Sequence, residues 1–159
     1  MKKRIFFLMF GFVLMAAGLS AQQAKTYCNN RFGFCVNYPD MLKPASDGPA
    51  NGDGIILEGE EGIKVSISGS FNVMGWTPQR IYEFALEDLT ADLGTEVKPV
   101  GPRIDTDGFE ARFSTDEVYQ YARMWSLGDT YLIINISGPK AASEKIETLK
   151  DRIATSFGS

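Results

Sequence analysis

The residues best suited to recognition chemistry in this 159-residue chain form a run of aromatic and cationic side chains. Tyr119, Tyr121, Arg123 and Trp125 are separated by steps of two, and residues at this spacing share one face of a β-strand. Flat rings beside a guanidinium group are suited to stacking a sugar or a peptide. The opposite face of the same strand is also apolar. The alternative is therefore a central strand, covered on both sides, whose aromatic rings pack beneath a helix.

Trp76 is a second candidate anchor, because it follows the irregular stretch Val73-Met74-Gly75. An exposed tryptophan in such a stretch is typical of a recognition site, whereas a covered one packs at the entry of the next helix. The chain has two tryptophans, and the second lies in the aromatic run. We therefore take four residues as candidate ligand- or partner-binding residues: Trp76, Tyr121, Arg123 and Trp125.

Two aspartate-containing loops raise the question of a metal. Asp47, Asn51 and Asp53 lie in a glycine-rich loop, and their oxygen atoms suit a hard cation such as calcium. The same residue types also favour a tight turn. The segment 105 to 108 begins like a calcium loop, but Phe109 stands where an oxygen ligand should follow, so an Asp-Gly hairpin turn is favoured. We predict turns at both places and no metal site.

The chain has no histidine, which excludes a histidine general base, a Ser-His-Asp or Cys-His arrangement, and the usual histidine-containing metal sites. A hydrolase built on paired carboxylates remains an alternative. It would need two acids in one cleft, and the sequence does not place Asp53, Asp105 or Asp129 together. No nucleophile, base and orienting group can be assembled from the sequence, so we predict neither catalytic residues nor a cofactor.

Cys28 and Cys35 are the only cysteines. An even cysteine count in an exported chain favours a disulfide, which would remove roughly 2.5 kcal/mol of unfolded-state entropy by closing this short loop. Free thiols are one alternative. A redox pair is another, although the spacing is not C-x-x-C.

The N-terminus has the layout of a secretory signal peptide. Three basic residues, Lys2, Lys3 and Arg4, precede an apolar run and the small-residue stretch 18 to 21. A retained membrane anchor is the alternative, but the apolar stretch is shorter than the roughly 20 residues that span a bilayer. We expect residues 1 to 21 to be a signal peptide and residues 22 to 159 to be one domain, located in the periplasm or secreted.

The charge balance limits the class of partner. Three of the 16 Lys and Arg residues lie in the leader, so the remaining chain carries 13 against 20 Asp and Glu, a formal charge near −7. This acidic balance argues against nucleic acid and against an anionic membrane surface, since both recruit basic patches. We expect an envelope protein or peptide as partner, a monomeric chain, and no membrane span in the mature chain.

Hydrophobic periodicity predicts an α+β fold with two amphipathic helices packed on an antiparallel sheet. Thr77, Pro78 and Gly94 mark the ends of the first helix. The second is expected over residues 141 to 156, with Ile146, Leu149, Ile153 and Phe157 along one stripe. The predicted strands cover residues 32–38, 55–58, 63–68, 97–104, 109–114, 118–127 and 131–137, and residues 27–29 pair back on the first of these.

Several short segments together resemble PsbP-like domains. They are Phe32-Gly33-Phe34 running into Tyr38-Pro39, the turn Asn51-Gly52-Asp53-Gly54, the late hairpin about Gly128-Asp129, and the closing Ser156-Phe157. The resemblance covers nearly the whole mature chain and implies an antiparallel sheet between helices. Members are mostly non-enzymatic assembly or binding factors, including extrinsic photosystem proteins. The absence of histidine and of transit-peptide character sets this chain apart from the photosynthetic members, so no photosystem role is inferred.

The sequence thus favours an exported, non-catalytic binding or assembly module. A carboxylate-based hydrolase of the cell envelope and a calcium-dependent binding module are the alternatives.

Overall fold

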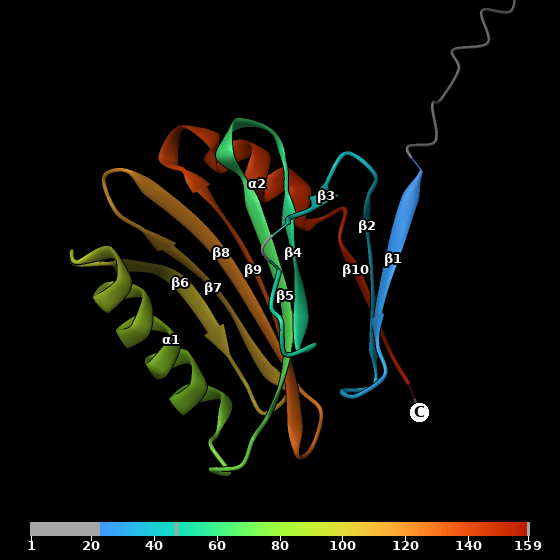
Figure 1. Ribbon diagram of the computed structural model, residues 1–159. Helices are drawn as coiled ribbons and strands as arrows, with labels where there is room; N and C mark the ends of the chain where they lie inside the picture. The colour runs from blue at the N-terminus through green and yellow to red at the C-terminus, as the bar shows by residue number, and fades with distance from the viewer. Residues whose placement is uncertain (1–22, 47, 159) are drawn as a thin grey trace, which may run out of the picture.

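Two antiparallel sheets and two helices make up the structure, a computed structural model that describes residues 23–46 and 48–158 (Figure 1). The smaller sheet has the order β1-β2-β10. Its strands are β1 (Ala24–Asn29), β2 (Phe34–Pro39) and β10 (Ala154–Phe157). The predicted signal peptide and Asp47 lie outside the described residues.

The larger sheet has seven strands in the order β3-β4-β5-β9-β8-β7-β6. They are β3 (Lys43–Pro44), β4 (Gly54–Glu58), β5 (Lys64–Phe71), β6 (Lys98–Ile104), β7 (Gly108–Ser114), β8 (Val118–Ser126) and β9 (Thr130–Pro139). The short 3-10 turns η1 (Glu60–Gly62) and η2 (Lys140–Ala142) lie between β4 and β5 and after β9. All neighbouring strands are antiparallel, and the predicted α+β class is confirmed.

Helix α1 (Pro78–Leu93) has the ends that the sequence predicts. The hydroxyl of Thr77 accepts the backbone N–H of Arg80 at 3.3 Å, which satisfies one of the free donors of the first turn. Gly94 ends the helix in the left-handed conformation, with φ at +60°, where a residue without Cβ is favoured.

Helix α2 (Ser143–Lys150) is shorter than expected. The predicted helix over residues 141 to 156 is wrong beyond Lys150, because residues 154 to 157 form β10 and pair with β2, Ala154 opposite Asn37 and Phe157 opposite Phe34. Since β1 occupies one edge of β2, this pairing satisfies the backbone groups of the other edge. Ile153 packs against the core, as it would also do in a continued helix. The spacing of apolar residues therefore did not distinguish a helix from a strand in this segment.

Each face of the seven-stranded sheet has its own apolar core. On one face, α1 covers a cluster that includes Tyr82, Phe113 and Met124. On the other, the three-stranded sheet and α2 cover a cluster that includes Val36 and Ile146. Figure 1 shows α1 and the small sheet on opposite sides of the large one. No helix among the described residues is both long and apolar enough to cross a membrane.

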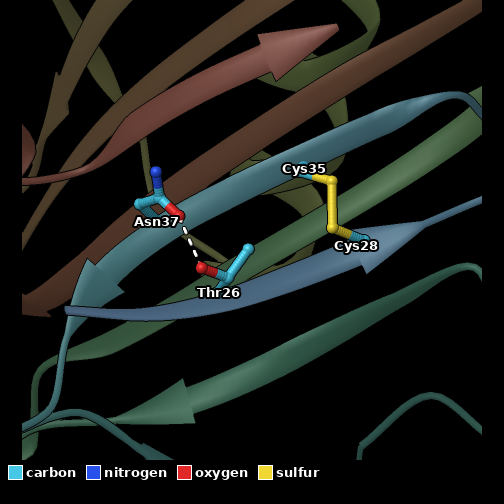
Figure 2. Close-up of a disulfide and its surroundings, with 4 residues drawn as sticks. All are labelled: Thr26, Cys28, Cys35 and Asn37. Carbon is cyan, nitrogen blue, oxygen red and sulfur yellow. Dashed lines mark hydrogen bonds between the residues drawn. A yellow bond between two sulfur atoms is a disulfide. The ribbon is translucent and has the colours of Figure 1, made fainter. Parts of the chain in front are cut away.

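The hairpin of β1 and β2 carries the two cysteines as directly opposed residues (Figure 2). The Sγ atoms of Cys28 and Cys35 lie 2.03 Å apart, at disulfide-bonding distance. On the same face of the hairpin, the hydroxyl of Thr26 donates to Oδ1 of Asn37 at 2.7 Å. These two cross-strand contacts hold β1 in register with β2.

Candidate functional site

The aromatic run lies on one face of β8, as predicted. Tyr119, Tyr121 and Trp125 pack against the core between the two sheets, whereas Ala122 and Met124 belong to the core beneath α1. The alternation of β8 therefore places the aromatic residues on the face that α2 and the small sheet cover. Tyr121 is buried there, whereas Tyr119 and Trp125 are only partly covered.

Three of the four predicted binding residues line one cavity. Tyr121, Arg123 and Trp125 surround a hollow of about 160 Å³ between β8 and the end of α2. Lys150 and Asp151 form its opposite wall. Glu110 of β7 and three isoleucines, Ile134, Ile136 and Ile153, complete the lining.

Arg123 is the more accessible of the two basic groups in this cavity, since 45% of its side chain is exposed against 17% for Lys150. Its guanidinium carbon lies 4.9 Å from the ring centroid of Trp125, a cation–π distance. Nη1 also forms an ion pair with Glu110 at 3.3 Å. These two contacts hold the guanidinium beside the indole, so little further ordering of Arg123 is needed when a ligand binds.

A charged network supports the cavity from one side. Nε and Nη2 of Arg112 donate to the two carboxylate oxygens of Glu147 at 2.9 and 3.0 Å, and the hydroxyl of Tyr119 donates to Oε1 at 2.7 Å. Burial by itself would raise the pKa of Glu147, but the hydrogen bonds from Arg112 and Tyr119 outweigh it and lower the pKa below its ordinary value. The carboxylate is therefore firmly ionised, and it ties α2 to β7 and β8.

The residues Tyr119, Tyr121, Arg123 and Trp125 are called the β8 strip below, and both of its tyrosines resist ionisation. Burial, together with the hydrogen bond to Glu147 and its negative charge, raises the pKa of Tyr119 to about 12. Burial also raises the pKa of Tyr121. Lys150 approaches the ring of Tyr121 at 5.8 Å, and its hydrogen bond to Asp151 is the main cause of its raised pKa. At neutral pH the phenols are neutral and Lys150 is charged.

The acids around the cavity do not have the environment of a carboxylate pair that shares catalytic roles. Such a pair needs one acid whose pKa is raised so that it can donate a proton. Glu147 has a lowered pKa, and Glu110 and Asp151 each form ion pairs with basic side chains. These carboxylates instead form ion pairs that hold the protein's own basic side chains in position.

Trp76 is separated from the other three candidates, because it belongs to the opposite face of the large sheet. Its ring lies 5.3 Å from that of Phe84 and 5.2 Å from the guanidinium of Arg80. The amide of Asn72 bonds both the N–H and the carbonyl of Trp76, at 2.8 and 2.9 Å. Trp76 thus packs at the start of α1, and the structure does not combine it with the β8 strip.

The loop considered for a cation has its carboxylate engaged by the protein. Asp53 forms an ion pair with Arg31 at 2.6 Å and accepts the amide of Asn51, also at 2.6 Å. The backbone N–H of Asp53 in turn donates to Asn51, which is the turn chemistry expected of these residues. Asp47 lies outside the described residues.

The other two acids considered for catalysis lie in turns of the large sheet. Oδ1 of Asp105 accepts the backbone N–H groups of Asp107 and Gly108 at 2.8 and 3.1 Å, as in the predicted Asp-Gly turn. Asp129 lies in the β8–β9 turn, where its carbonyl accepts the N–H of Asn72. Within the described part of the chain no three acidic or cysteine residues form a group that could hold a metal.

The sequence did not indicate four residues that shape this site: Glu110, Glu147, Lys150 and Asp151. Arg112 and Glu147 are 35 residues apart, and no local spacing relates them. The expected long helix also placed residues 150 to 153 within a continuous helical surface. The one local signal was the spacing of Glu147 and Lys150, which allows an (i, i+3) ion pair on a helix and forms one at 3.8 Å.

Comparison with known proteins identifies the fold. No family model matches the chain, and no curated protein matches it. Cyanobacterial PsbP (CyanoP) from Synechocystis sp. PCC 6803 superposes with a TM-score of 0.61 at 11% identity, over 92% of this chain and all of the other (100%). The Ran-binding protein Mog1p of Saccharomyces cerevisiae gives 0.59 at 13% identity, over 84% and 96% of the two chains. The chain has the PsbP-like fold.

Proposed function

We propose that this chain is a non-catalytic binding module of the cell envelope that recognises a protein or peptide through the cavity at Tyr121, Arg123 and Trp125. The observation that carries the proposal is the convergence of these three predicted residues on one hollow. Aromatic and arginine side chains supply most anchor energy at interfaces. Here the arginine is half exposed and stacked on the tryptophan.

The fold is compatible with partner recognition. Mog1p, which shares it, carries the description of a Ran-binding protein. That description concerns Mog1p; it supports the proposal only by showing that such a scaffold serves a binding protein. The ion-paired state of Glu110, Glu147 and Asp151 gives no support to the carboxylate hydrolase.

Export is the second part of the proposal. The leader pattern at residues 1 to 21 and the cysteine pair at disulfide distance both suit an oxidising compartment outside the cytoplasm. Intact-mass analysis of native, unreduced envelope material should give a chain that begins near Gln22 and has no thiol to label. A chain that retains Met1, or two reactive thiols, would contradict export or the disulfide respectively.

A monomeric state is the third part. The outer strand of the large sheet, β6, contains Pro99 and Pro102 and has an irregular register between Val100 and Arg103. Prolines and bulges at a sheet edge discourage pairing with another sheet. Sedimentation of the exported chain over a range of concentrations should give one monomeric species.

The binding role is tested by affinity capture from envelope extract with matched variants. Arg123→Ala and Trp125→Ala should lose the same set of captured proteins that the wild-type chain retains. Trp76→Ala serves as the control, since it removes an indole from the opposite face. Each variant is first checked for folding by circular dichroism and thermal unfolding. Loss of capture with Trp76→Ala alone, or unchanged capture with all three, would contradict the proposed site.

A further inference from the structure

A second cavity lies on the other flank of α2. It has a volume of about 380 Å³, within the range of small-ligand pockets. Its walls are mainly apolar and are formed by Met41, Leu42, Ile63 and Leu149. Three parts of the chain contribute them: the turn after β2, the turn between β4 and β5, and α2.

The walls of this cavity are well fixed. Leu42 and Leu149 are buried core residues, and the backbone N–H of Leu42 donates to the carbonyl of Pro39 at 3.1 Å. The β4–β5 turn is closed by the N–H of Gly59, which donates to the carbonyl of Ile63 at 2.8 Å. Lys145 of α2 forms an ion pair with Glu61, which links the helix to the β4–β5 turn.

The charged side chains at the rim of this cavity differ in whether they have partners within the protein. Lys145 is paired with Glu61, and Nη1 of Arg152 contacts the sulfur of Met41 at 3.5 Å. The carboxylates of Glu60 and Glu144 also line the cavity. Neither carboxylate has an ion-pair or hydrogen-bond partner among the described residues. Glu60, Glu61 and Glu144 outnumber Lys145 and Arg152, so the rim has an excess of negative charge.

From this combination we infer that the cavity binds a basic side chain, lysine or arginine, of a partner polypeptide. Such a side chain joins an aliphatic stem to a cationic head. The stem would contact Met41, Leu42 and Leu149, while the head would reach the carboxylates of Glu60 and Glu144 at the solvent edge. The acidic balance of the chain outside its leader favours the approach of a basic partner as well.

The inference does not depend on the proposed role of the β8 strip. The two cavities share no lining residue, and they lie on different flanks of α2. A partner that used both would straddle this helix, but either cavity can fail as a binding site without affecting the other. Trp125→Ala should therefore leave the affinity of the second cavity unchanged.

The test uses three synthetic peptides of equal length that differ at one central residue, which is lysine, norleucine or glutamate. Norleucine retains the aliphatic stem without the charge, so the set separates the two parts of the inference. Titrations of the ¹⁵N-labelled chain should show the tightest binding for the lysine peptide. The amide shifts should centre on Leu42, Ile63 and Leu149.

A charge-neutralising double variant sharpens the test. Glu60→Gln combined with Glu144→Gln should weaken the lysine peptide about threefold to tenfold, the scale of ion pairs at exposed sites, and leave the norleucine peptide unchanged. The matched control is Glu96→Gln combined with Glu117→Gln, which removes two exposed glutamates elsewhere and should change neither affinity. Raised salt should weaken the lysine peptide alone.

Three results would overturn the inference. Equal affinity of the wild-type chain for the lysine and norleucine peptides would mean that the charge selects nothing. Amide shifts confined to other surfaces would place the binding elsewhere. Absence of binding up to the solubility limit of the lysine peptide would remove the site altogether. An unchanged amide spectrum of each variant before titration ensures that lost affinity is not lost folding.

Discussion

The two flanks of α2 carry similar residues in opposite electrostatic states. On the flank that faces β8, Glu147 is bound by Arg112 and Tyr119 and lies 3.8 Å from Lys150. On the other flank, the carboxylate of Glu144 has no ion-pair or hydrogen-bond partner among the described residues, and only its backbone carbonyl accepts a hydrogen bond, from Thr148. Both are glutamates of one short helix. The comparison indicates that a compensated carboxylate holds the fold together, whereas an uncompensated one beside an apolar hollow is available to a ligand.

The largest expected difference between the flanks is in stability. Glu147→Ala should lower the free energy of unfolding by about 2–3 kcal/mol, because Tyr119 loses its charged acceptor and Arg112 keeps only its ion pair with Glu110. Glu144→Ala should change it by no more than about 0.5 kcal/mol, as is usual for exposed sites. Urea denaturation measures both values. Equal losses of stability for the two substitutions would contradict the difference proposed between the two flanks.

A smaller difference is expected between the apolar side chains of the two cavities. Trp125→Ala should cost about 1–2 kcal/mol, less than the roughly 3–5 kcal/mol of a fully buried aromatic residue, because the indole is only partly covered. Met41→Ala on the other flank, where the side chain is 41% exposed, should cost about 0.5 kcal/mol. Thermal unfolding of the two variants gives the ranking. If Trp125→Ala prevents folding, the tryptophan is a core residue and the proposed binding role loses its main anchor.

Acid should weaken the contacts of Glu147 on the β8 flank of α2. The pKa of Glu147 is lowered in the folded chain, so its stabilising effect is complete above the unfolded pKa and is lost as the pH falls through the lower folded pKa. The stability difference between the wild type and Glu147→Gln should therefore be constant near neutral pH and shrink below about pH 4.5, the ordinary value. Urea denaturation at a series of pH values measures it. A difference that grows in acid would contradict the assigned direction.

The smallest predicted effect is on one tyrosine. Tyr119 should ionise near pH 12 in the folded chain, and Glu147→Gln should lower this pKa by removing the negative charge beside the phenol. ¹³C resonances of the tyrosine rings, assigned with Tyr119→Phe, follow the ionisation. Because the folded pKa is raised, the associated stability is present below the unfolded pKa and is lost as the pH rises toward 12. Ionisation of Tyr119 at its ordinary value would remove it from the network.

Much of the fold could be predicted from local patterns, because those patterns report local physics. The Thr77-Pro78 start and the Gly94 end fix α1 through capping groups within a few residues. The alternation of β8 placed Tyr121, Arg123 and Trp125 on one face, since the strand period leaves no other choice. The sequence left open whether that face was exposed or packed beneath a helix. In the structure α2 and the small sheet cover most of it, which the sequence alone could not decide.

The errors and omissions lie where distant segments meet. The end of α2 depends on whether residues 154 to 157 continue a helix or pair with β2, and β2 lies more than 100 residues away in the sequence. The Arg112–Glu147 contact and both cavities likewise join separate elements. In each case the side chains have ordinary local patterns, and only the tertiary arrangement gives them a shared environment.

Strand β2 also brings the two ends of the described chain together. Its pairing with β1 is local, and the cross-link between Cys28 and Cys35 spans a sequence separation of 7. Its pairing with β10 uses residues 154 to 157 and is among the least local contacts in the molecule. Contacts of such high sequence separation slow folding because a long loop must close first. The small sheet therefore has a fast half and a slow half, and hydrogen exchange during refolding should protect the β1–β2 amides before those of β10.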